Sequence, residues 1–69
     1  MDIIKEKEFN FLKMDVREWC AALNNKLEQM TLAELRHAGN QELLTKLYNH
    51  IVESGAALLK FIHSTQAHK

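Results

Sequence analysis

The stretch NQELLTKLYNHIVESGAALLKFIH, residues 40–63, decides the fold. When its residues are placed on a helical wheel at about 100° per residue, the apolar side chains gather on one side. A seam with alternating spacings of four and three residues runs along that side and comprises Leu44, Tyr48, Ile51, Gly55, Leu58 and Ile62. This pattern predicts one long amphipathic helix that packs against other helices.

The apolar arc covers roughly half of the wheel, which is wider than contact with a single neighbouring helix requires. We expect Leu43, Leu47 and Phe61 to form a second surface beside the seam. The opposite side of the wheel is polar and should face solvent, with Lys46, Asn49, Glu53 and Lys60. The helix should therefore contact other helices on two sides.

Gly55 lies inside this helix, where glycine costs about 1 kcal/mol relative to alanine. Two interpretations fit. The glycine is a tolerated weak point or small bend, or it marks a close crossing at which small residues allow two helix backbones to approach. Because Gly55 belongs to the predicted seam, we favour the close crossing.

A second apolar stripe begins at about Lys5 and stays within a narrow arc. It comprises Phe9, Leu12, Val16, Trp19, Cys20, Leu23, Leu27 and Met30. The simplest interpretation is one helix of about 25 residues. In the alternative interpretation Asp15 and Glu18 start a new helix, because D-x-x-E resembles a capping box. In a continuous helix Phe11 and Met14 point outward beside Glu18 as a candidate partner patch, whereas a break would bury them.

Between the two long stripes, Thr31 and Glu34 have the spacing of a capping box. We expect a short helix from Leu32 to about His37, ended by Gly39 in the left-handed conformation. Asn40 is the expected N-cap of the next helix. The predicted fold is all-α: a single domain, 1–69, in which two long antiparallel helices form a hairpin joined by a short helix. Residues 1–4 and 64–69 should fray.

A chain of 69 residues buries only about 60% of its unfolded surface, and such chains usually need disulfides, a metal or a partner subunit. The single cysteine excludes a disulfide within the chain. We therefore expect a homodimer in which two hairpins form a four-helix bundle. Its predicted interface comprises Leu43, Leu44, Leu47, Tyr48, Ile51, Gly55, Leu58, Phe61 and Ile62.

No group of residues carries a recognisable catalytic or metal-binding pattern. His63 and His68 have a spacing that zinc ligands use, but no cysteine pair accompanies them. Cys20 is expected to be a buried small hydrophobic side chain rather than a nucleophile. We therefore expect no enzyme activity, no metal and no cofactor.

Residues 31–51 superficially resemble a helix-turn-helix, with a recognition helix that would begin at Gln41. The exposed early positions of that helix would be Gln41, Glu42, Thr45, Lys46 and Asn49. One base and one acid are a poor set for binding phosphates. A DNA-binding transcriptional regulator is therefore the alternative hypothesis.

The formal net charge is zero, which favours neither nucleic acid nor an anionic membrane. No stretch approaches the roughly 20 apolar residues that cross a bilayer, and the first residues lack the apolar core of a signal peptide. A lone thiol fits a reducing cytoplasm. We expect a small cytoplasmic protein–protein interaction module that acts as a regulator, adaptor or inhibitor of a larger protein.

Overall fold

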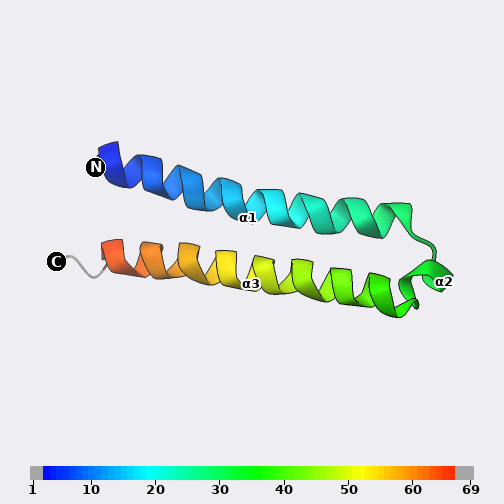
Figure 1. Ribbon diagram of the computed structural model, residues 1–69. Coiled ribbons are helices and arrows are strands. Elements are labelled where there is room, and N and C mark those ends of the chain that lie inside the picture. The colour runs from blue at the N-terminus through cyan, green and yellow to red at the C-terminus, as the bar shows by residue number, and fades with distance from the viewer. Residues whose placement is uncertain (1–2, 67–69) are drawn as a thin grey trace.

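The computed structural model describes residues 3–66, and within that range every regular element is a helix. The elements are α1, Ile3–Gln29, α2, Leu32–Leu35, and α3, Ala38–Gln66. Helices α1 and α3 lie side by side and antiparallel, with α2 at the turn that joins them (Figure 1). The predicted all-α helical hairpin is confirmed.

Helix α1 is continuous through Asp15, so the predicted alternative of a break there is wrong. Residues 3–29 contain no proline or glycine, and their apolar stripe keeps one phase, so nothing in the chain interrupts the helix. The Asp15 carboxylate does not cap a helix. Its Oδ2 accepts a hydrogen bond from the Ser54 hydroxyl of α3 at 2.7 Å.

The predicted capping box at the start of α2 is confirmed. The Glu34 amide donates to Thr31 Oγ1 at 3.3 Å, and Glu34 Oε1 accepts from the Thr31 amide at 2.9 Å and from its hydroxyl at 3.0 Å. The backbone hydrogen bond from Thr31, with its hydroxyl bond second, lowers the pKa of Glu34 below the ordinary value of 4.5. These bonds satisfy amides that the first turn of a helix leaves unpaired.

The junction between α2 and α3 differs from the prediction in three respects. Helix α2 ends at Leu35 rather than near His37, and α3 begins at Ala38, so Asn40 is not its N-cap. The Asn40 side-chain amide instead donates to the Glu34 carbonyl at 2.7 Å. Gly39 has no positive φ and lies inside α3, so it does not terminate α2. Side-chain amides therefore satisfy carbonyls at the end of α2, where a left-handed glycine was expected.

The helix–helix seam of α3 is shifted by one residue from the predicted seam. Leu47 and Ser54 are the two buried side chains among residues 3–66, at 8% and 7% exposure. Tyr48 is 60% exposed and Gly55 is half-buried. The observed seam comprises Leu44, Leu47, Ile51, Ser54, Leu58, Phe61 and Thr65. It packs on Phe9, Leu12, Val16, Trp19 and Leu23 of α1.

Gly55 does not mark a close crossing between α1 and α3. A Cβ atom added to it would meet nothing within 4 Å. Helices α1 and α3 therefore do not form the predicted close crossing, because the glycine lies beside their seam rather than in it.

Three side-chain contacts fix how α1 and α3 are aligned. The centroids of the Phe9 and Phe61 rings are 6.5 Å apart. The Trp19 ring stacks on the imidazole of His50, with 4.1 Å between the ring centroids and an angle of 6° between the ring planes. The hydrogen bond between Ser54 and Asp15 lies between these two contacts along the hairpin. A polar pair in an apolar seam disfavours other alignments, because sliding one helix would separate it.

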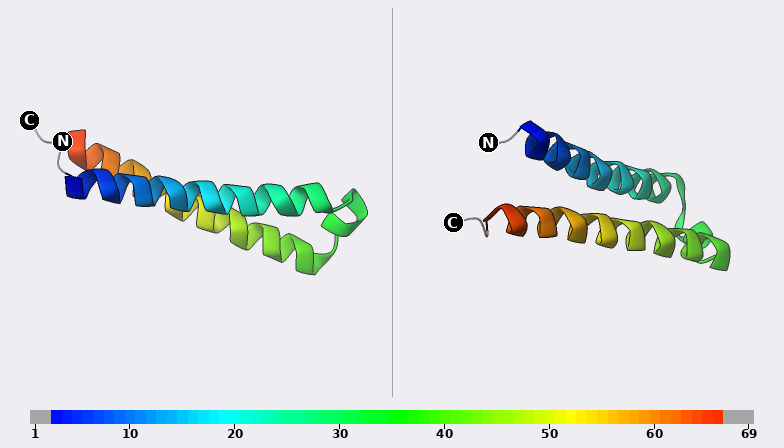
Figure 2. Two further views of the ribbon diagram at one scale, coloured as in Figure 1. Left: turned by 90° about the horizontal axis from the view of Figure 1, so that it is seen from above. Right: turned by 60° about the vertical axis from the view of Figure 1, so that its left-hand side comes forward.

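The hairpin is long and thin, with extents of 52 × 17 × 13 Å. Its radius of gyration is 15.8 Å, whereas a compact domain of this length would have about 11 Å. Figure 2 shows that the two long helices form a single layer in the described part of the chain. Both broad faces of that layer are therefore open to solvent or to a partner.

Candidate interaction surfaces

One edge of α3 carries an apolar stripe that α1 does not cover. Tyr48, Val52 and Leu59 are 60%, 49% and 57% exposed. Their spacings of four and seven residues place them in one row on the helix. Gly55 and Ile62 continue the same row and are half-buried. Each residue of this row comes directly after a seam residue in the sequence.

Helix α1 has a matching row of residues that also follow its seam. Cys20 is exposed and Leu27 is 46% exposed, so the prediction that Cys20 is buried is wrong. In two antiparallel helices, positions that follow the seam by one residue lie on the same broad face. We call this surface the open face and define it as Asn10, Lys13, Arg17, Cys20, Asn24, Leu27, Tyr48, Val52, Gly55, Leu59 and Ile62. Lys13 and Arg17 are its charged residues, so its apolar part lies mainly on α3.

The residues of the predicted dimer interface separate into three groups. Leu47 and Phe61 pack on α1 of the same chain, so the prediction that they form a second surface is wrong. Leu44, Ile51 and Leu58 lie in the seam and are half-buried, and Leu43 is half-buried on the flank away from the open face. The last group, Tyr48, Gly55 and Ile62, lies on the open face. The structure adds Val52 and Leu59, which were not part of the predicted interface.

The predicted external patch lies on the side of α1 that faces away from α3. Phe11 is 71% exposed and Met14 is 57% exposed, and Glu18 is exposed beside them. An open, shallow depression adjoins the patch and is lined by Asn10, Lys13, Met14, Arg17, Glu18 and Ala21. The ammonium of Lys13 sits 5.1 Å from the centre of the Phe9 ring. The basic side chains at this depression were not part of the predicted patch.

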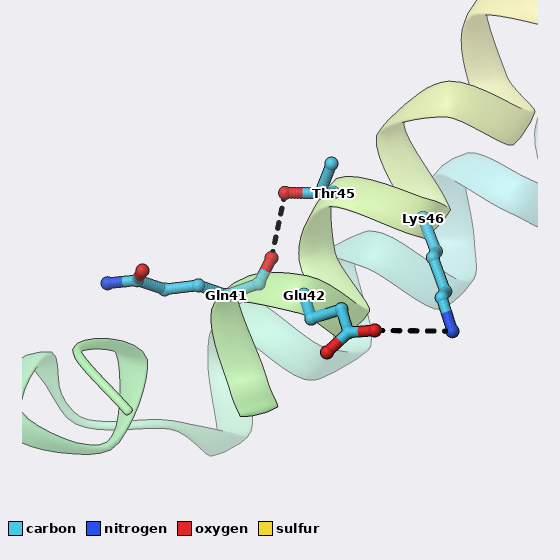
Figure 3. A network of polar contacts seen from close by, with 4 residues as sticks. All are labelled: Gln41, Glu42, Thr45 and Lys46. Carbon is cyan, nitrogen blue, oxygen red and sulfur yellow. Dashed lines mark hydrogen bonds and ion pairs between the residues drawn. The ribbon is translucent and has the colours of Figure 1, made fainter. Parts of the chain in front are cut away.

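The start of α3 shows how the residues of the helix-turn-helix hypothesis are engaged. Lys46 lies 3.7 Å from Glu42, and the Thr45 hydroxyl donates to the Gln41 carbonyl at 2.8 Å (Figure 3). The Gln41 side chain donates to the Arg36 carbonyl at 3.3 Å. The one basic side chain of this set therefore has a carboxylate beside it, which reduces the positive field that a phosphate would meet.

Residues 3–66 contain no group of three or more His, Cys, Asp or Glu side chains that could hold a metal ion. His68, one of the two histidines with zinc-like spacing, lies outside the described residues. In the same range no helix is long and apolar enough to cross a membrane.

No protein-family model matches the chain, and the searches of curated proteins and of solved structures found no match. The candidate sites are therefore the two exposed surfaces, the open face and the outer patch of α1.

Proposed function

We propose that this protein is a small self-associating interaction module, in which two hairpins pair through their open faces and the pair then binds a larger protein. The proposal rests on the exposed apolar side chains of the open face. A set of neighbouring apolar side chains that is exposed in a single copy is typical of surfaces that another protein covers. The second copy is the occupant that the size of the exposed surface favours.

The accessible surface of the hairpin is 5653 Å². A folded monomer of 8.0 kDa is expected to expose about 4,450 Å². The hairpin thus exposes roughly 1,200 Å² more than a compact protein of its mass. If a second copy covers that excess on each chain, the contact buries about 2,400 Å² in total, which is within the range of obligate homodimers.

The interior of one hairpin supports the same conclusion. Leu47 is the one buried apolar side chain that residues 3–66 contain, and the other apolar seam residues keep part of their surface in contact with water. Small domains of this length rarely have enough buried apolar surface for a stable fold without help. Pairing of the open faces would convert the half-buried residues beside them into a four-helix core.

The outer side of α1 would stay accessible in such a pair. Phe11 and Met14 are large apolar side chains that contribute little to the hairpin, and Arg17 and Glu18 stand beside them. Exposed aromatic and methionine side chains with charged neighbours are common where helical proteins bind partners. We assign the regulator or adaptor role to this patch. We also propose a reducing compartment such as the cytoplasm, which fits a chain with a single cysteine.

Light scattering on a size-exclusion column tests the open face. Val52→Glu places a charge in the middle of the face, while Asn49→Glu places the same charge on the solvated side of α3. We expect the unmodified chain and Asn49→Glu to elute as dimers and Val52→Glu to elute as a monomer with unchanged helical circular dichroism. A dimeric Val52→Glu variant would show that another surface mediates association.

A further inference from the structure

Gly55 leaves a gap in the middle of the open face, between Val52 and Leu59. An added Cβ atom would meet nothing within 4 Å, so the packing of α3 on α1 does not require glycine there. Glycine in a helix interior is nevertheless destabilising relative to alanine. The single hairpin therefore offers no packing reason for a residue without a side chain at this point.

Tyr48 lies one heptad before Gly55 in the same row of the open face. It is 60% exposed and is the bulkiest side chain of that face. Its ring is apolar, while its hydroxyl could stay hydrated at the edge of an interface. The open face thus carries one projection and one gap, separated by seven residues along one helix.

We propose that two copies pack through their open faces with their turns at opposite ends, so that Tyr48 of each copy fills the gap at Gly55 of the other. This inference rests on the self-association proposed above. The two-fold axis would pass between Ile51 and Val52, near the middle of α3, where two antiparallel copies of Ala38–Gln66 overlap most. In that alignment Leu44 also lies opposite Leu59 of the second copy.

The other face-to-face arrangement places both turns at the same end, so that α1 packs on α3 of the second copy. Since Asp15 is bonded to Ser54, Lys13 is level with the neighbourhood of Gly55. The second copy would therefore direct Lys13 toward the gap. A lysine ammonium is strongly hydrated and is a poor filling for an apolar gap. The arrangement with the turns at opposite ends fills the gap with the apolar Tyr48 ring instead.

Spin-label distances distinguish the two arrangements. Gln41→Cys, made together with Cys20→Ser, carries one label near the turn of each copy. Turns at opposite ends would separate the two labels by roughly 30 Å or more along the helices. Turns at the same end would place them within about 20 Å, because neighbouring helix axes are 8–10 Å apart. A dimer with the short distance overturns this arrangement but leaves self-association intact, whereas a monomer in light scattering overturns both.

The gap itself is tested by filling it. Gly55→Leu should leave the hairpin helical and weaken association roughly tenfold or more, because the added side chain occupies the place of the tyrosine ring. Ala56→Leu is the matched control on the solvated side of α3 and should leave the dissociation constant unchanged. A Gly55→Leu variant that dimerises as tightly as the unmodified chain would show that no side chain of the second copy enters the gap.

Discussion

Replacing Leu59 by alanine is the perturbation whose size the structure allows us to work out best. The change removes three carbon atoms, worth about 0.8 kcal/mol each when buried. Because 57% of Leu59 is exposed in one hairpin, a second copy could cover that share of it, which corresponds to about 1.4 kcal/mol per chain. Each dimer contains the residue twice. The dissociation constant should therefore rise by between about tenfold and a hundredfold.

The assay for this prediction is a sedimentation equilibrium series over a wide range of concentrations. Leu32→Ala is the matched control, because Leu32 is 64% exposed in α2 and lies outside the open face. We expect the control to leave the dissociation constant within about twofold of the unmodified value. Equal dissociation constants for Leu59→Ala and Leu32→Ala would refute the assignment of Leu59 to the interface.

Three further predictions concern the hairpin itself and are measured by thermal or urea unfolding. Ser54→Ala should cost about 1 kcal/mol, because it removes a hydrogen bond to a partly buried carboxylate, and an unchanged stability would mean that water replaces that bond. Thr31→Ala should cost about 1 kcal/mol at neutral pH. The Thr31 amide, the larger cause of the lowered Glu34 pKa, stays in this variant, and only the hydroxyl bond to Glu34 is lost. The part of the cost due to that hydroxyl bond is present above the ordinary value of 4.5 and is lost as the pH falls through the folded-state pKa, so an equal cost at neutral and at acid pH would contradict this role of the hydroxyl. The double change Phe11→Ser and Met14→Ser should alter stability by less than about 0.5 kcal/mol, and a large loss would show that these side chains are core.

The helices could be predicted from the sequence because both signals are local. The apolar stripe of α1 keeps one phase over several heptads, and the capping box of α2 is formed by residues only three apart. The exposure of Phe11 and Met14 followed directly from the continuity of α1. These features depend on helical geometry alone, which the order of residues specifies.

The seam of α3 could not be placed to within one residue, because two rows share Leu44, Ile51 and Leu58. One row adds Tyr48 and Gly55, and the other adds Leu47 and Ser54. Leu47 is more apolar than Tyr48, which favours the second row, whereas Ser54 is more polar than Gly55, which disfavours it, so hydrophobicity does not decide between the rows. The choice depends on Asp15 of α1, which offers Ser54 a hydrogen-bond acceptor across the seam. That contact joins residues 39 positions apart and is not visible in the periodicity of either helix.

Positions that come one residue after a seam face the open side, which explains the exposure of two other residues. Cys20 and Tyr48 follow their seams by one position, so they are exposed although each lies among apolar residues. At the turn, Gly39 is a residue type that commonly ends a helix, and Asn40 is a residue type that commonly begins one. The side-chain amide of Asn40 satisfies the end of α2 directly, so neither signal is used in the expected way.

The central claim is that a second copy of the chain covers the open face. The molar mass of the unmodified protein, measured by sedimentation equilibrium from low to high micromolar concentration, tests it most directly. We predict a reversible approach to about 16 kDa, twice the 8.0 kDa of one chain. A constant 8.0 kDa species that remains fully helical at high micromolar concentration would contradict the claim.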